Sequence, residues 1–110
     1  MRYTAAMQEP GIDRHEWETE WEALEPLVVD SPAEALPELD ALVERMMVES
    51  GYPVDEEGGR EHAEPEVVAE FLEARRIAEA ADRGEDVDPG DIGAAITSYR
   101  SLYEFLLNRP

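Results

Sequence analysis

Apolar residues recur every three to four positions in four separate segments of this chain. This spacing places them on one face of a helix, whereas a half-buried strand would alternate apolar and polar residues. The segments begin near Asp13, Ser31, Pro65 and Asp88. A chain of 110 residues is one domain by length. The sequence therefore predicts an all-α fold, a small antiparallel bundle of three to four helices over residues 11–110, after a flexible N-terminus at residues 1–10.

Local signals mark where these helices begin and end. Ser31, Pro32 and Glu34 form the pattern of a capping box, and Asp88 with Pro89 forms a second helix start. Gly51 and Gly84 occupy stop positions after the second and third helices. The boundaries of at least three helices are thus predicted from local residues.

Prolines and glycines predict interruptions. Pro26 disfavours helical geometry at Glu25, so the first helix is expected to stop or bend there, and Pro37 is expected to kink the second. Residues 53–64, PVDEEGGREHAE, are acidic and rich in Gly and Pro. This composition predicts a mobile loop.

Candidate contact residues lie at the margins of the apolar stripes. Trp17 and Trp21 share one helix face, where burial of both rings is strongly favoured. Trp21 is predicted in the core, while Trp17, nearer the chain end, is expected to be half covered and able to touch a partner. Phe105 lies off the stripe of the 88–107 segment, which is expected to be the central helix; it either contacts a partner or is covered by the first helix. Met46 is either a core residue or an adaptable contact.

The charge of the chain limits its partners. Twenty-eight acidic residues face nine basic ones, all arginine, for a net charge of −19. Such a surface repels nucleic acids and anionic membranes, so neither is expected as a partner. A basic protein would be attracted. The same charge also fits a role in solubility alone, or a proteome biased toward Glu and Arg by coding composition or salt.

Motifs for catalysis, cofactors or metals are absent from the sequence. There is no cysteine, and no serine lies in a nucleophile motif. Neither histidine has a glutamate three residues before it, as carboxylate-bridged metal sites in bundles require. A calcium loop counted from Asp86 fails because Gly90 is fifth instead of sixth. No catalytic, cofactor-binding or metal-binding residue is predicted, and no enzyme activity.

No apolar run approaches the roughly 18 residues of a membrane span. The first residues, MRYTAAMQEPGID, lack the regions of a signal peptide. The absence of cysteine fits a reducing compartment. We therefore expect a cytoplasmic protein.

Two blocks carry a resemblance. From Trp21 the chain reads WEALEPLVVDSPAEALPELDALVERMM, similar to a tryptophan, an FVDDP-like turn and a helix with an AD-x-LV-x-x-VM core. From Arg83 it reads RGEDVDPGDIGAAITSYRSLYEFLL, similar to a helix ending in YR-x-F/L-F/Y-x-x-LL. Together these blocks, about half of the chain, resemble a family of small actinobacterial helical proteins of unassigned activity. The segment around residues 51–65, Pro26 and Pro37 depart from its pattern. The resemblance implies a helical single domain and no particular activity.

The sequence thus predicts a non-catalytic acidic helical protein that acts through protein–protein contact. Its partner is unidentified, with a basic protein favoured by charge, and a homodimer is a further expectation. One alternative is a nucleic-acid mimic that inhibits a basic protein. A more remote alternative is a carboxylate metal binder. The contact residues expected are Trp17, Phe105 and Met46.

Overall fold

The computed structural model describes residues 10–109, with side chains from residue 14 onward. Five helices and no strand occur in this range, which confirms the predicted all-helical fold. They are α2 (Pro10–Asp30), α3 (Pro32–Glu49), α4 (Glu56–Glu61), α5 (Pro65–Asp82) and α6 (Pro89–Leu107). The predicted flexible N-terminus lies outside the described residues except for Pro10, which begins α2.

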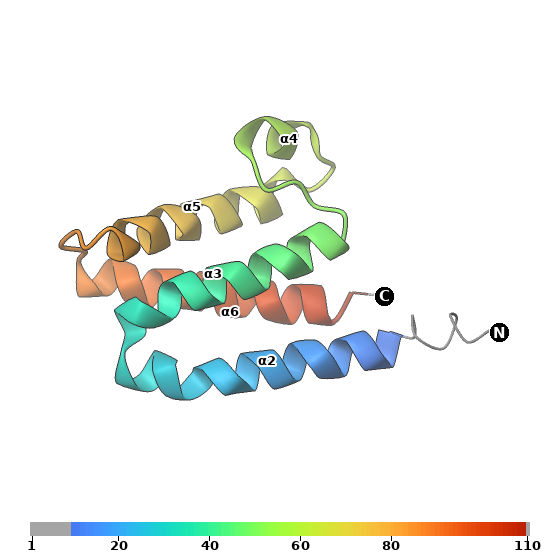
Figure 1. Cartoon of the computed structure of the whole chain (residues 1–110). Coiled ribbons are helices and arrows are strands. Elements are labelled where there is room, and N and C mark those ends of the chain that lie inside the picture. Colours follow the sequence, from blue (N-terminus) through green and yellow to red (C-terminus); the bar gives the residue numbers. More distant parts are fainter. Residues whose placement is uncertain (1–9, 110) are drawn as a thin grey trace.

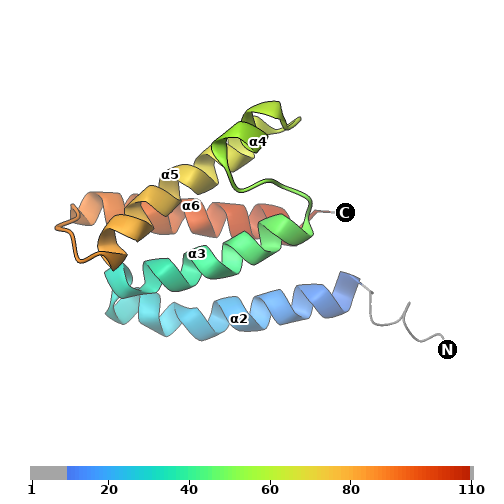
Figure 2. The same ribbon diagram turned by 45° about the horizontal axis from the view of Figure 1, so that its top comes forward.

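The four long helices pack side by side (Figures 1 and 2). α3 and α6 each contact the other three long helices, so the predicted central position of the last helix is shared with α3. The short helix α4 packs on α5, and in both views it lies on the far side of the bundle from α2.

The core is formed where the apolar stripes of α3, α5 and α6 meet. Tyr99, Phe71 and Leu36 are its largest fully buried side chains. Trp21 of α2 is also buried, as predicted, and its ring stacks on Tyr103 with centroids 4.3 Å apart. The Trp21 Nε1–H group donates to Glu25 at 2.7 Å, which satisfies the one polar atom of the indole.

The first helix is longer than predicted. α2 continues through Pro26 to Asp30, and the Ser31 amide donates to the Leu27 carbonyl at 2.7 Å. Pro26 is exposed, so water can reach the backbone group that the proline leaves without a partner. Leu27 and Val28 pack against the core, and this packing outweighs the local preference against helix.

The helix starts follow the predicted signals in part. Pro32 does occupy the first turn of α3, but the Ser31 side chain makes no capping hydrogen bond, so the predicted capping box is wrong. Asp88 does cap α6 by accepting from the Gly90 amide at 2.7 Å. Gly51 and Gly84 both have positive φ angles, as their stop positions require.

The segment predicted as a mobile loop contains α4, so that prediction is wrong for residues 56–61. Asp55 caps the helix by accepting from the Gly58 amide at 2.6 Å. Gly59 is buried against Val68 of α5, and a Cβ atom on Gly59 would lie 2.6 Å from Val68 Cγ1. Here glycine provides close packing between two helices instead of backbone freedom.

Replacement of Gly59 by alanine is expected to force α4 away from α5, because the added methyl group has no room beside Val68. The free energy of unfolding should fall by about 1–3 kcal/mol. The matched control is Gly93→Ala in α6, where a Cβ atom meets nothing within 4 Å. Alanine should there raise stability by up to about 1 kcal/mol through its helix propensity. Urea unfolding followed by circular dichroism measures both, and equal stabilisation would contradict the docking of α4.

Candidate functional site

A polar cluster joins three helices inside the bundle. The Tyr99 hydroxyl of α6 donates to Asp40 Oδ2 of α3 at 2.6 Å. Arg75 of α5 donates to both oxygens of the same carboxylate, with Nη2 2.7 Å from Oδ1 and Nε 3.1 Å from Oδ2. Arg75 also pairs with Glu44, and its guanidinium lies over the Phe71 ring at 4.7 Å. Both carboxylate oxygens of Asp40 thus accept hydrogen bonds from other helices of the bundle.

The surroundings fix the charge of two members of this cluster. Burial raises the pKa of Tyr99, and the hydrogen bond to Asp40 raises it further, so the hydroxyl stays protonated at neutral pH. The hydrogen bond to Asp40 raises the pKa of Arg75 against the opposing effect of burial, so the guanidinium stays charged. Strongly shifted pKa values often mark active sites. Neither shift here brings a group toward neutral pH, and Tyr99 is fully buried, so the geometry is that of a structural contact.

The sequence contains a signal for this cluster, although each apolar stripe taken alone does not reveal it. Asp40 lies four residues after Leu36 and three before Val43, within the apolar stripe of α3. Arg75 lies four residues after Phe71 within the stripe of α5. Opposite charges placed inside two apolar stripes indicate a partnered pair, because an unpaired charge there would be costly.

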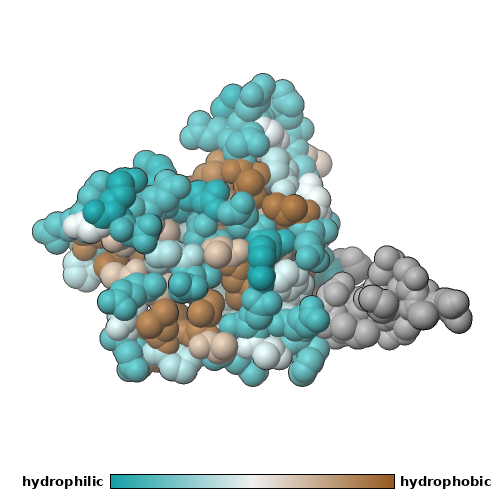
Figure 3. All heavy atoms as spheres, viewed as in Figure 1, coloured by the Kyte–Doolittle hydropathy of each residue, from teal (hydrophilic) through white to brown (hydrophobic). Residues whose placement is uncertain are grey.

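A surface groove follows the seam between α2 and α3. It consists of two adjoining hollows of about 580 and 310 Å³, which share Glu20, Ala41 and Arg45. We call it the α2/α3 groove; its lining residues are Glu16, Trp17, Glu20, Ala23, Leu24, Glu38, Ala41, Leu42, Glu44, Arg45, Val48 and Glu49. On the face drawn in Figure 3, apolar atoms appear over α2 and α3 among hydrophilic ones.

Apolar and charged groups are both present in this groove. Trp17 is half-buried, while Val48 remains 57% exposed. The Arg45 guanidinium lies over the Trp17 ring at 5.3 Å and pairs with Glu20 across the seam. The groove therefore combines an aromatic and aliphatic floor with a rim of carboxylates.

The three predicted contact residues lie in different environments. Trp17 lines the α2/α3 groove, half-buried as expected. Met46 is 2% exposed and belongs to the core, so in this fold it offers no contact surface. Phe105 is 42% exposed and lines another hollow, near Tyr52 and Arg109, so α2 does not cover it. Sequence reasoning missed Val48 because an exposed valine leaves no periodic signal.

Metal ligands and membrane-spanning helices are two further features of functional importance. Residues 14–109, whose side chains the structure describes, contain no group of three or more His, Asp or Glu side chains placed to hold a metal ion. A membrane span needs a long apolar helix, and no helix of residues 10–109 meets the requirement. No family model, curated protein or solved structure matches this chain. The resemblance noted from the sequence therefore stays a prediction.

Substitution of Asp40 by alanine is expected to lower the free energy of unfolding by about 3 kcal/mol, because it leaves Arg75 and Tyr99 without their shared acceptor. Glu38→Ala is the matched control, since Glu38 is exposed on the same helix. That control should stay within about 0.5 kcal/mol of the wild type. Urea unfolding compares the two; a similar small effect for both would contradict a structural role for the cluster.

The raised pKa of Tyr99 predicts alkaline sensitivity. An unfolded tyrosine loses its proton near pH 10, whereas native Tyr99 keeps it, so its contribution to stability is complete below pH 10 and decreases above. The stability gap between the wild type and Tyr99→Phe should narrow by about 1 kcal/mol between pH 10 and 11. Burial also raises the pKa of Tyr52 and Tyr103, but both proteins contain these residues. A constant gap in urea unfolding across this range would refute the assignment.

Proposed function

We propose that this protein is a non-catalytic binding module whose α2/α3 groove receives a basic, apolar-anchored helical segment of a partner protein. The observation that carries the proposal is the exposed Val48 beside the half-buried Trp17. These two side chains offer apolar surface that the fold itself leaves uncovered. Aromatic residues with an apolar body and a polar atom are common anchors of protein interfaces.

The charges around this floor favour a basic partner. Five glutamates line the groove, against the single arginine Arg45. Glu20 pairs with Arg45, and Glu44 pairs with Arg75. The others, Glu16, Glu38 and Glu49, form no ion pair with any residue of the described chain. Lysine or arginine side chains on a partner could form ion pairs with these glutamates. Such complementary charges increase the rate and the selectivity of association.

The dimensions of the groove suit a helix. Its wall on α3 extends from Glu38 to Glu49, roughly 17 Å at 1.5 Å per residue. A partner helix of about three turns has that length. Such a helix would lay one apolar stripe along the seam and direct its basic residues toward both rims.

Nucleic-acid mimicry remains the second candidate. The ordered helix α4 supports it, because acids at Glu56, Glu57 and Glu61 are held on a helix. On α2, however, arginines of the same chain already pair with Glu18, Glu20 and Glu25. These pairs reduce the free charge that a phosphate-like array needs. Metal binding by carboxylates is less favoured still, because the described residues gather no suitable ligand set.

Self-association is a weaker expectation. Two copies with a net charge of −19 each repel one another. Phe105, the residue that suggested a homodimer, already has the Arg109 guanidinium 5.6 Å from its ring centroid and Tyr52 at its edge. Arg45 lies over the Trp17 ring in the same way, but Val48 of the α2/α3 groove is 57% exposed, against 42% for Phe105.

The role of the α2/α3 groove in partner binding can be tested with two valine substitutions that each add one positive charge. Val48→Arg removes the apolar anchor inside the groove and repels basic residues, whereas Val29→Arg changes an exposed valine outside it. Immobilised wild type and both variants would be incubated with lysate of the native organism and washed at about 0.15 M and then 0.5 M salt. We expect a basic protein that the wild type and Val29→Arg retain and that Val48→Arg loses at least about tenfold.

Three results would count against this proposal. Equal retention by both variants would place the contact elsewhere on the surface. Capture of nucleic-acid-binding proteins that both variants retain alike and that high salt releases would favour mimicry, since screening weakens exposed charge contacts most. An empty eluate from the wild type would contradict both binding hypotheses.

A further inference from the structure

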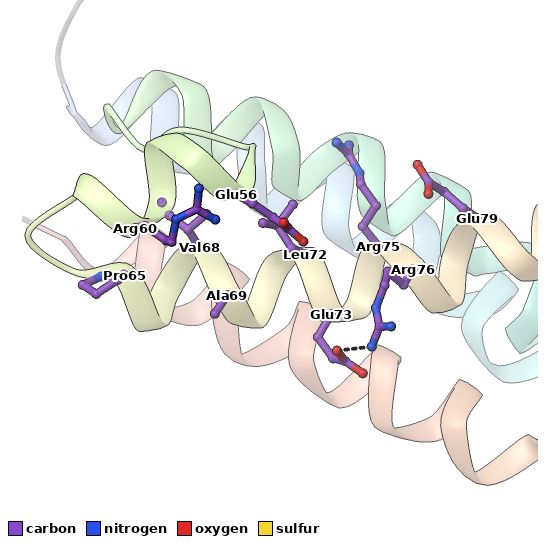
Figure 4. Close-up of a pocket in the computed structure, with 11 residues that line it drawn as sticks. Glu56, Arg60, Pro65, Val68, Ala69, Leu72, Glu73, Arg75, Arg76 and Glu79 are labelled. Atoms are coloured by element: carbon purple, nitrogen blue, oxygen red, sulfur yellow. Dashed lines mark hydrogen bonds and ion pairs between the residues drawn. The ribbon is translucent and has the colours of Figure 1, made fainter.

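A second groove of about 530 Å³ lies between α4 and α5, away from the α2/α3 groove (Figure 4). We call it the α4/α5 groove. Its apolar lining includes Pro65, Val68, Ala69 and Leu72, and all of them belong to α5. The volume is within the range of small-molecule sites, about 300–1,000 Å³.

Arg60 is unusual among the arginines of this chain. Within the described residues, seven of the eight arginines form an ion pair with a carboxylate, and Arg60 does not. Glu56 precedes it by four residues, a spacing at which glutamate and arginine commonly pair on a helix. Figure 4 draws no ion pair between Arg60 and Glu56, and both residues line the groove together with Val68 and Leu72. A cation thus lies next to apolar surface without a counterion from the described chain.

The docking of α4 places Arg60 in the lining of the groove. Gly59 is buried against Val68 with no room for a side chain, so α4 packs closely on α5. Arg60 follows Gly59 directly in the chain and lines the groove with Val68 and Leu72. The other two arginines of the groove are less available: Arg75 is held by Asp40 and Glu44, and Arg76 pairs with Glu73. The Arg76–Glu73 pair is exposed, so it can rearrange at little cost.

We propose that the α4/α5 groove binds a small apolar carboxylate, with the carboxylate at Arg60 and the alkyl chain along Ala69 and Leu72. A guanidinium forms strong, directed hydrogen bonds to a carboxylate. The apolar floor contributes through burial of methylene groups. This proposal does not depend on the proposed binding of a partner protein in the α2/α3 groove, and either proposal can be correct if the other is wrong.

The net charge of the protein favours a small monoanion over an acidic macromolecule. An extended polyanion would be repelled along its whole length by a protein with a net charge of −19. Salt screens charges beyond about 8 Å at physiological ionic strength, so a single carboxylate at Arg60 responds mainly to nearby groups. Glu56 and Glu79 also line the groove, and both carboxylates are expected to weaken binding.

Octanoate is the probe, and chemical-shift changes of backbone amides are the readout. We expect saturable changes at residues 56–61 and 68–76, with a dissociation constant on the order of 1 mM. Hexanoate should bind several-fold more weakly because it buries two fewer methylene groups. Acetate, and 1-octanol, which lacks the carboxylate, should produce little change at these positions.

Charge substitutions in α4 sharpen the test in both directions. Arg60→Gln should weaken octanoate binding by at least about fivefold, and Glu56→Gln should strengthen it. Arg83→Gln is the matched control, because it removes an arginine that is exposed, outside the groove and paired with Glu85. It should leave the dissociation constant unchanged. Both α4 residues are exposed, so neither substitution threatens the fold.

Several outcomes would overturn the assignment. They are the absence of saturable shifts with octanoate, equal shifts with 1-octanol, and equal effects of Arg60→Gln and Arg83→Gln. Tighter binding of a glutamate-rich helical peptide at the same amides would assign the groove to a protein partner instead. Failure of the lysate experiment on Val48 would leave these results unaffected, because the two grooves share no lining residue.

Discussion

The contact among Asp40, Arg75 and Tyr99 links three of the four long helices, α3, α5 and α6, in one register. It connects α3 to α5 through a paired guanidinium and carboxylate, and α3 to α6 through a tyrosine hydroxyl. Apolar stripes of suitable volume tolerate much repacking, so they specify a fold class more firmly than one register. A hydrogen-bonded pair inside such stripes favours one arrangement, because a slip would leave a partly buried charge without its partner.

Features that depend on neighbouring residues could be predicted from the sequence, and those that depend on distant ones were missed. Periodicity located the long helices and the burial of Trp21, and Gly84 marked the end of α5. Pro26 and the Gly/Pro-rich segment misled the prediction because local preferences there are outweighed by packing of Leu27 and Gly59 against other helices. Grooves also depend on residues distant in the sequence, because their walls come from two helices. The sequence predicted Trp17 at the surface, but it did not predict that Val48 lies beside it.

The two grooves differ in the charge that they leave unpaired, because most arginines of the chain already form ion pairs with its carboxylates. On α2 and α3, glutamates outnumber arginines, and several stay without a counterion among the described residues. On α4, Gly59 packs closely on α5, and Arg60 lines the α4/α5 groove without an ion pair among the described residues. The local charge of a surface therefore follows from which pairs the fold completes, and it can oppose the net charge of −19.

The ion pairs of Arg75 with Asp40 and Glu44 also explain why Arg75 is not expected to bind a ligand of the α4/α5 groove. Arg75 lines the α4/α5 groove, yet Asp40 and Glu44 occupy its guanidinium from the side of α3. A carboxylate that recruited Arg75 would have to break bonds on which the packing of α3 and α5 depends, at a cost larger than one surface ion pair returns. Arg60, in contrast, forms no ion pair within the described residues, so a ligand could bind it without breaking one. Anion binding in the α4/α5 groove is therefore expected to depend on Arg60 of α4 and not on Arg75 of the bundle.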